Sequence, residues 1–199
     1  MEQRDAVTAL VLAAGGGRRL GGRPKALLPY RGRPLVEHAA AAARAGGCRE
    51  VTVVLGADRD RVRSTAHLPD CRLVANPDWA SGMGSSLRAG LAALPAGSSA
   101  VLVMLVDTPG VGPAAVARLL AAHRAGAGLA AATYGGRRGH PVLIGAGYLA
   151  EAAAGARGDA GARALLAAHA DELVPVECAD VASADDLDTP ADLARWGAG

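Results

Sequence analysis

The sequence is poor in aromatic residues and in cysteine. It has no phenylalanine, two tryptophans and three tyrosines, so few rings are available to stack on nucleic-acid bases. Its cysteines, Cys48, Cys71 and Cys178, are far apart, and no two have the CxxC spacing of a zinc or redox site. This use of cysteine is typical of a reducing compartment, and we expect a cytoplasmic protein.

A long apolar run and a strong excess of one charge are also missing. No uninterrupted apolar stretch approaches the roughly 18 residues that a membrane span needs. The 21 basic and 19 acidic residues leave a formal net charge of +2, without the positive excess typical of nucleic-acid-binding proteins. We therefore expect no membrane and no nucleic acid among the partners.

The near-neutral total hides an uneven distribution of charge. Residues 1–50 carry nine basic and four acidic side chains, whereas residues 151–199 carry three basic and ten acidic ones. Lys25 is the one lysine among the 21 basic residues, and all the others are arginine. A lysine in so arginine-rich a chain favours a site for a compact point charge, such as a phosphate site, although chance explains it equally well.

The spacing of apolar runs indicates an α/β protein. With 199 residues, 51% of them hydrophobic, we expect one domain over residues 1–199. Strands and helices are predicted in alternation, which favours a mainly parallel sheet. The expected strands are residues 7–14, 51–55, 101–106, 129–134, 141–144 and 173–176, and the expected helices are residues 35–45, 87–94, 114–125, 161–170 and one that begins at Thr189 and Pro190.

The turn after the first expected strand is the strongest local signal. Residues 12–29 read LAAGGGRRLGGRPKALLP and hold four cations, Arg18, Arg19, Arg23 and Lys25. Glycines let backbone N–H groups approach a ligand and the cations neutralise negative charge, so this turn suits a polyphosphate. The other interpretation is a solvated basic turn.

Two well-known phosphate loops do not match this turn. A dinucleotide-binding fingerprint that began at Gly15 would need a glycine where Leu20 stands. A Walker loop would need glycine before Lys25 and a hydroxyl residue after it, but Pro24 and Ala26 stand there. The turn therefore belongs to neither class.

A carboxylate follows the most apolar run of the chain. Residues 101–106 end at Asp107, and an aspartate at the end of a buried strand beside a phosphate-binding turn suits Mg²⁺. The alternative is an ordinary turn aspartate. A second carboxylate could come from Asp186 or Asp188, although Asp188 could equally belong to the turn that begins the last helix.

These segments carry a family resemblance. Residues 12–35, LAAGGGRRLGGRPKALLPYRGRPL, resemble the signature LAAGxxxRMGxxxKxLLxxxGxPL of the NTP-transferase family related to the molybdenum-cofactor cytidylyltransferase and guanylyltransferase, with Leu20 in place of the usual methionine. NPDWASGMGSSLRAGL, VLVMLVDTPGV, GHPVLI, GDAGARALL and DLDTPADL are similar to its later blocks. The resemblance implies a single-domain three-layer α/β/α sandwich with a mixed, mainly parallel sheet and a Rossmann-like nucleotidyltransferase fold.

The resemblance also implies a reaction. It is the Mg²⁺-dependent transfer of a nucleoside monophosphate from an NTP to a phosphate-bearing acceptor of the molybdopterin type, with release of pyrophosphate. Ala14 belongs to the LAAG form of the signature, which favours CTP over GTP. The alternatives are a guanylyltransferase, a sugar- or alcohol-phosphate nucleotidyltransferase, and an NTP-binding cofactor chaperone without catalysis. A molybdoenzyme or a second copy of the chain is a candidate partner.

The resemblance assigns roles to individual residues. It implies Lys25, Arg19 and Asp107 as catalytic residues, and Asp107 and Asp188 as metal ligands. The implied acceptor-binding residues are Thr108, Arg138 and His140. The implied nucleotide-binding residues are Leu12, Ala13, Ala14, Gly15, Gly16, Gly17, Arg18, Lys25, Asn76, Gly82, Met83 and Ser86.

Three glycines lie between two of the late strands. Gly135, Gly136 and Gly139 predict an open, mobile loop there, of the kind that folds over a ligand. The same loop carries the basic residues Arg137 and Arg138.

Overall fold

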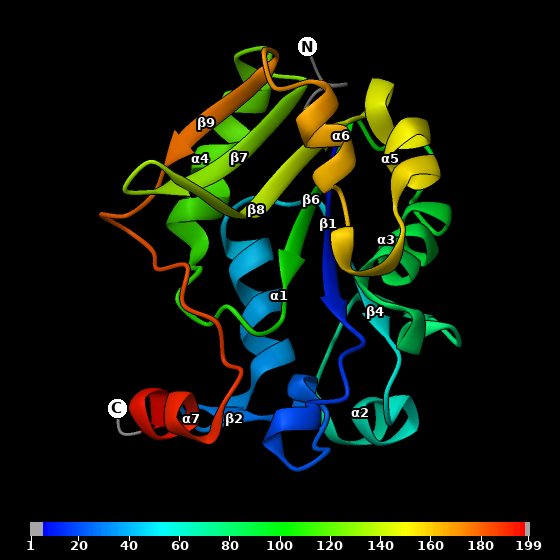
Figure 1. Cartoon of the computed structure of the whole chain (residues 1–199), viewed down its shortest axis with the longest axis vertical. Helices are drawn as coiled ribbons and strands as arrows, with labels where there is room; N and C mark the ends of the chain where they lie inside the picture. Colours follow the sequence, from blue (N-terminus) through cyan, green and yellow to red (C-terminus); the bar gives the residue numbers. More distant parts are fainter. Residues whose placement is uncertain (1–5, 198–199) are drawn as a thin grey trace.

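A seven-stranded sheet forms the centre of the molecule (Figure 1). The structure, a computed structural model, describes residues 6–197 except for the side chain of Arg18. The strand order is β5-β4-β1-β6-β8-β7-β9, and β8 is antiparallel to both of its neighbours while all other pairs are parallel. The mainly parallel, mixed sheet is thereby confirmed. The strands are β1 (Val7–Ala13), β4 (Glu50–Leu55), β5 (Cys71–Ala75), β6 (Ala100–Leu105), β7 (Leu129–Tyr134), β8 (Arg137–Gly145) and β9 (Leu173–Glu177).

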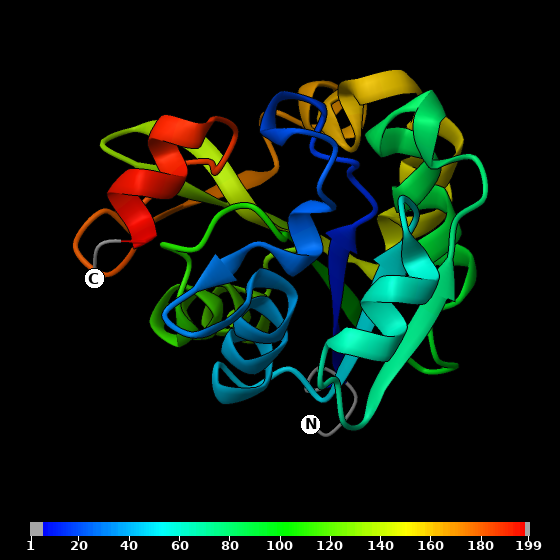
Figure 2. The same ribbon diagram turned by 90° about the horizontal axis from the view of Figure 1, so that it is seen from below.

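Helices cover both faces of the sheet, so the predicted three-layer α/β/α sandwich is confirmed (Figures 1 and 2). Helices α1 (Leu35–Ala45) and α4 (Pro113–Arg124) pack on one face. Helices α3 (Met83–Ala92), α5 (Leu149–Gly155) and α6 (Arg163–Ala168) pack on the other. Helices α2 (Arg59–Thr65) and α7 (Pro190–Gly197) lie towards the end of the sheet where β1 and β6 finish, as does the short hairpin of β2 (Pro29–Tyr30) and β3 (Arg33–Pro34).

The apolar run of β1 is explained by burial on both faces. Ala9 and Val11 belong to the core beneath α1 and α4, whereas Leu10 and Leu12 belong to the core beneath α3, α5 and α6. All four side chains are at most 7% exposed. A strand covered on both sides has no solvent face, so its sequence does not alternate. None of the helices within residues 6–197 is long and apolar enough to cross a membrane.

The expectation of an open glycine loop is wrong. Gly135 and Gly136 form the two-residue turn of the β7–β8 hairpin, with φ of 58° and 78°, and Gly139 lies within β8. Positive φ at both central residues matches the twist of paired strands, which is why such turns favour glycine. The carboxylate of Glu177 accepts hydrogen bonds from the N–H groups of Gly135 (3.1 Å) and Gly136 (3.3 Å) and from the Thr133 hydroxyl (3.0 Å), so the turn is tied to the end of β9.

Candidate functional site

The fold brings the glycine-rich turn and Asp107 together because they follow adjacent parallel strands. β1 pairs with β6 up to Leu12 and Leu105, so the two segments that follow these strands leave the sheet side by side. The turn then folds back on itself, with the Lys25 N–H donating to the Gly15 carbonyl at 3.2 Å. Gly17 is required here because its φ is 57° and a Cβ would lie 2.0 Å from the Arg23 carbonyl oxygen.

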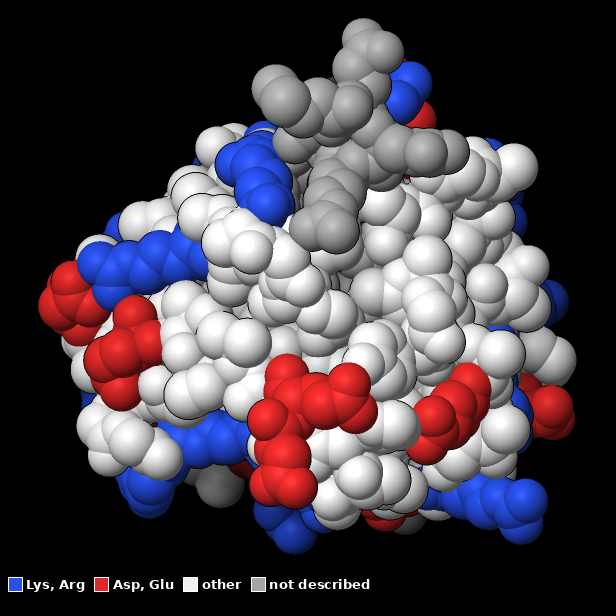
Figure 3. Space-filling model, turned by 90° about the horizontal axis from the view of Figure 1, so that it is seen from above, with Lys and Arg blue, Asp and Glu red and all other residues white. Residues whose placement is uncertain are grey.

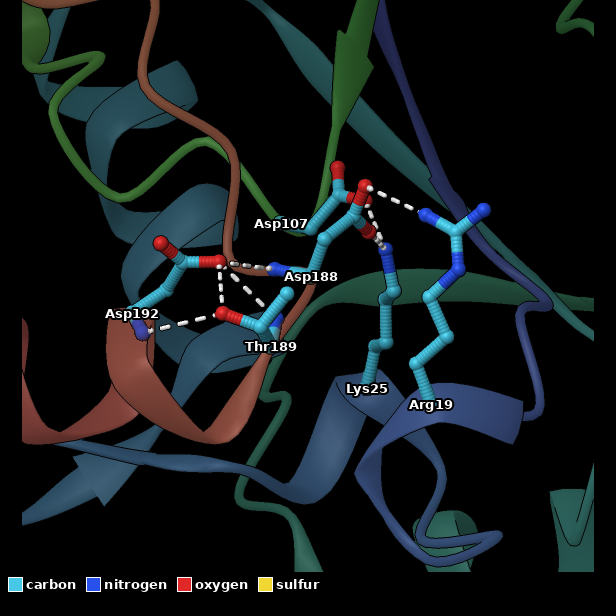
Figure 4. A network of polar contacts seen from close by, with 6 residues as sticks. All are labelled: Arg19, Lys25, Asp107, Asp188, Thr189 and Asp192. Carbon is cyan, nitrogen blue, oxygen red and sulfur yellow. Dashed lines mark hydrogen bonds and ion pairs between the residues drawn. The ribbon is translucent and has the colours of Figure 1, made fainter.

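Lys25 forms the centre of the polar network in Figure 4. Its ammonium donates to Asp107 Oδ2 at 2.5 Å and also forms an ion pair with Asp188 Oδ1. Burial lowers the pKa of Lys25, but the carboxylates of Asp107 and Asp188 outweigh that effect and raise the pKa above its ordinary value. Lys25 is therefore held in its charged form. The exposed Arg19 approaches the same carboxylate, with Nη1 4.0 Å from Asp188 Oδ2.

The chain delivers Asp188 to this network through two anchors. Leu187 is fully buried, and its N–H donates to the Asp107 carbonyl at 2.8 Å. Thr189 directly precedes α7. The Asp192 carboxylate accepts from the Thr189 N–H at 2.8 Å, and the Asp192 N–H donates back to the Thr189 hydroxyl at 3.2 Å. These reciprocal bonds cap the helix. Thr189 therefore caps the helix while Asp188 reaches Lys25, and metal binding by Asp188 stays a prediction.

The convergence of Asp107 and Asp188 suits a divalent cation. Both carboxylates reach one point, the Lys25 Nζ. Burial, together with the nearby charges of Asp107 and Asp188, raises the pKa of Asp186 to about 6. Mg²⁺ prefers oxygen ligands and typically takes one or two protein carboxylates together with phosphate oxygens. Within residues 6–197 no group of three His, Cys, Asp or Glu side chains forms a metal site on its own. A cation here would therefore complete its coordination from the ligand and water.

A cavity of about 420 Å³ opens beside the glycine-rich turn. It contains most of the residues predicted to bind a nucleotide, and Trp79, Ser81 and Asp159 also line it. The predicted residues that line it are Leu12, Ala14, Gly15, Gly16, Lys25, Gly82, Met83 and Ser86.

Three residues predicted to bind the nucleotide do not line this cavity. Ala13 is 1% exposed in the core beneath α1, and Gly17 shapes the turn through its backbone. Asn76 is 3% exposed, and its amide donates to the hydroxyls of Ser85 (2.8 Å) and Ser86 (3.0 Å). The Asn76 side chain therefore holds the start of α3, and Asn76 also lines a smaller cavity next to Trp79, so its contact with a nucleotide stays a prediction. The side chain of Arg18 lies outside the described part of the chain.

A second cavity, of about 530 Å³, contains all three residues predicted to bind the acceptor, Thr108, Arg138 and His140. It shares Lys25, Asp107, Met83 and Leu105 with the first cavity. Burial lowers the pKa of His140, so its imidazole is neutral at pH 7. The backbone of His140 is fixed by the Tyr134 hydroxyl, which donates to its carbonyl at 2.6 Å.

Two charged residues of the cavities did not stand out in the sequence. Arg163 lines the second cavity, and Asp159 lines the first. Asp186, which the sequence offered as an alternative second carboxylate, also lines the second cavity. Asp159 and Arg163 belong to the segment GDAGARALL, where two charged residues flank glycine at the start of a helix. This pattern of charge and glycine could have marked the segment as a candidate site. The pattern does not show which strand ends the segment lies against.

The chain is similar to characterised proteins along most of its length. A family model described as the MobA-like NTP transferase domain matches residues 9–173. Nicotine blue oxidoreductase of Paenarthrobacter nicotinovorans is 46% identical over 196 residues, which cover 95% of each chain. Bifunctional protein GlmU of Kineococcus radiotolerans is 43% identical over 132 residues, which cover 63% of this chain and 27% of that protein.

Solved structures agree with the family match. The homologue of Rv0371c from Mycobacterium sp. strain JC1 has a TM-score of 0.83 and 33% identity, covering 98% of this chain and 96% of that one. Rv0371c of Mycobacterium tuberculosis H37Rv, solved in complex with manganese, has a TM-score of 0.79 and 28% identity, covering 96% and 97%. The predicted family is confirmed: the chain belongs to the MobA-like NTP transferase family and is a nucleotidyltransferase of that family.

Proposed function

We propose that the protein transfers a nucleoside monophosphate from CTP to a small phosphate-bearing acceptor of the molybdopterin type and releases pyrophosphate. The observation that carries this proposal is the junction of two cavities at Lys25 and Asp107. A donor in the first cavity and an acceptor in the second would meet at these two side chains. Positioning and charge neutralisation at such a junction are the main requirements of nucleotidyl transfer.

The donor cavity suits a triphosphate. The N–H groups of the turn from Gly15 to Arg19 and the ammonium of Lys25 would neutralise the phosphate oxygens. Arg19 is exposed, so its side chain is free to move from Asp188 onto a phosphate. Ala14 lines the cavity and belongs to the form of the signature that favours CTP.

The acceptor cavity suits a phosphate nucleophile. Arg138 and Arg163 supply positive charge, and His140 and Thr108 supply hydrogen-bonding groups. A phosphate monoester, whose second pKa is about 6, is mostly a dianion at pH 7 and needs no dedicated general base. Its oxygen forms a bond to the α-phosphorus of CTP, the bond from that phosphorus to the bridging oxygen breaks, and pyrophosphate leaves with the bonding electrons.

Asp107 and Asp188 are the residues that would hold Mg²⁺. The bound ion would supply positive charge to the phosphate oxygens. Lys25 now neutralises both carboxylates, so we expect its ammonium to turn to the phosphates when a nucleotide binds. The manganese complex of Rv0371c supports use of a divalent cation in this family.

Pyrophosphate release tests this proposal. The protein is incubated with Mg²⁺, each of the four NTPs and a series of phosphate-bearing acceptors that includes molybdopterin. We expect release with CTP and one class of acceptor, because both cavities must be filled. Tight CTP binding without release for any pair would instead support the cofactor chaperone, and release with GTP or with a sugar or alcohol phosphate would correct the donor or the acceptor.

The relation to nicotine blue oxidoreductase supports a second candidate, an oxidoreductase. The two proteins are 46% identical over 95% of both chains, so the similarity extends over nearly their whole length. A reduced nicotinamide dinucleotide has a pyrophosphate group that the glycine-rich turn could hold, and it would donate hydride to a ring compound in the second cavity. Loss of nicotinamide absorbance in the presence of nicotine blue, without pyrophosphate release, would favour this candidate over nucleotidyl transfer.

A further inference from the structure

Trp79 contributes the one aromatic ring among the described residues that line the first cavity. It begins a short 3₁₀ turn, Trp79–Ser81, between β5 and α3. Trp79 also lines a smaller cavity of about 310 Å³, so it borders two hollows of the surface. Within residues 6–197 its ring N–H makes no hydrogen bond, and the ring is half-buried. An indole in this setting is held by contacts rather than by hydrogen bonds.

Two glycines from different strand ends make the space for this indole. A Cβ at Gly56, which follows β4, would lie 2.4 Å from Trp79 Cβ and 2.6 Å from Trp79 Cγ. A Cβ at Gly16, in the phosphate-binding turn, would lie 3.2 Å from the far edge of the same ring. Neither glycine has a positive φ, so backbone conformation does not demand glycine at either position. Glycine is required by the room that Trp79 needs, and at Gly56 also by the Ala14 Cβ, which would lie 2.8 Å from an added Cβ.

The ring stands next to the part of the cavity that the phosphates would occupy. Lys25 lies against Gly15 and Trp79 lies against Gly16, so the two side chains flank successive glycines of the turn. The residues that follow Trp79 along the cavity wall, Ala80, Ser81 and Gly82, are uncharged. A ligand with its phosphates at Lys25 would therefore extend its uncharged end towards the indole.

We propose that Trp79 is the stacking platform for the nucleobase of the bound NTP and that Gly56 sets its position. The proposal rests on the proposed use of an NTP donor. Every base has a π-face, so stacking supplies affinity for any nucleoside triphosphate without choosing the base. Trp79 should therefore distinguish nucleotides from polyphosphates that lack a base.

Tryptophan fluorescence and calorimetry without acceptor test this inference. Trp196→Phe leaves Trp79 as the single tryptophan. Trp196 packs against Tyr30, with 5.9 Å between the ring centroids, and it lines neither cavity. In this variant we expect Mg²⁺–CTP and Mg²⁺–GTP to quench the emission and Mg²⁺–tripolyphosphate to bind without quenching. In the wild-type background, Trp79→Ala should weaken CTP binding about 5- to 100-fold and leave tripolyphosphate binding unchanged.

Two further variants keep the test informative if Trp79→Ala is unstable. Trp79→Phe retains a ring and should keep most of the CTP affinity. Gly56→Ala leaves the indole in the chain but displaces it, so CTP binding should weaken while tripolyphosphate binding is retained. If Trp79→Ala weakened the binding of CTP and of tripolyphosphate equally, or did not weaken CTP binding, the stacking role of Trp79 would be overturned. Failure of pyrophosphate release with the expected binding pattern would overturn nucleotidyl transfer alone.

Discussion

At the scale of single residues, Lys25 shows why one lysine stands among so many arginines. Its ammonium reaches the carboxylates of Asp107 and Asp188 at one point, where the two cavities meet. A planar guanidinium is larger and donates in a fixed fork, so it does not fit a junction built for a point charge. The sequence raised the possibility of a special lysine, and the geometry gives a physical reason for it.

Substitution of Lys25 tests this reason. Lys25→Arg keeps the charge but changes its shape, and we expect kcat/KM for pyrophosphate release to fall about 100-fold. Arg33→Lys is the control, because Arg33 is exposed on β3 and lines neither cavity, so its replacement should leave kcat/KM unchanged. Equal activity of Lys25→Arg and wild-type protein would show that any cation suffices at this position.

At the scale of secondary structure, burial decides which elements the sequence revealed. β1 and β6 were predicted within one residue because both faces of each strand are buried. β5, α2 and α5 were missed. β5 is a half-exposed edge strand, and α2 buries one apolar side chain, Val62. α3 begins four residues earlier than predicted, at Met83, because the hydroxyls of Ser85 and Ser86 are held by Asn76.

The sequence predicted only those parts of the site that directly follow buried strands. Lys25 and Asp107 follow adjacent strands of an α/β sheet, so the sequence pattern places them at one edge. Asp188 lies 163 residues beyond Lys25 and reaches it through an irregular segment anchored by Leu187. No local pattern encodes that return of the chain. The open loop expected around Gly135 was wrong because the carboxylate that ties the turn, Glu177, lies 42 residues further along the chain, beyond any local pattern.

The β7–β8 hairpin yields a prediction about acceptor binding. Arg138 and His140 lie on β8, and Glu177 holds the turn that leads into it. Three backbone N–H groups and a hydroxyl hold the pKa of Glu177 at about 2, so it is ionised throughout the physiological range. Glu177→Ala should raise KM for the acceptor about tenfold and leave KM for CTP unchanged, because misplacement is confined to one cavity.

The control for this prediction comes from the same segment. Asp180 pairs with Arg118 on the surface, at 2.5 Å, and contacts neither cavity. Asp180→Ala should therefore leave both KM values unchanged. Equal increases in both KM values for Glu177→Ala would indicate general loosening of the fold and contradict a role in placing the acceptor.

At the scale of the whole molecule, the net charge of +2 combines a basic first part with an acidic last part, and the fold brings Lys25 of the first part against Asp188 of the last. Asp186 and Asp188 come from the acidic segment and line the cavity that contains Lys25. The opposite end of the molecule has charged side chains of both signs scattered over its described surface (Figure 3). The site is therefore a balanced set of charges rather than a simple basic patch.

An exposed cluster near the ends of α5 and α6 makes stability depend on pH. His169 Nδ1 lies 2.8 Å from Glu172 and Nε2 lies 2.9 Å from Glu151, and hydrogen bonds to these carboxylates raise the pKa of His169. A raised folded-state pKa gives stability that is present below the unfolded pKa of about 6.5 and is lost as the pH rises through the folded pKa. The melting temperature should therefore fall as the pH rises above about 6.5, and by more in the wild type than in His169→Gln. Parallel pH profiles for the two proteins would contradict this.

The most direct measurement compares Asp107→Asn with the wild type in Mg²⁺-dependent pyrophosphate release from CTP and a phosphate-bearing acceptor. Asparagine keeps the shape of the side chain but removes the charge that pairs with Lys25 and would hold the ion. We predict that release falls by about 100-fold or more while the melting temperature and the fold are retained. Near-normal release by Asp107→Asn would contradict a site in which this carboxylate holds the metal between donor and acceptor.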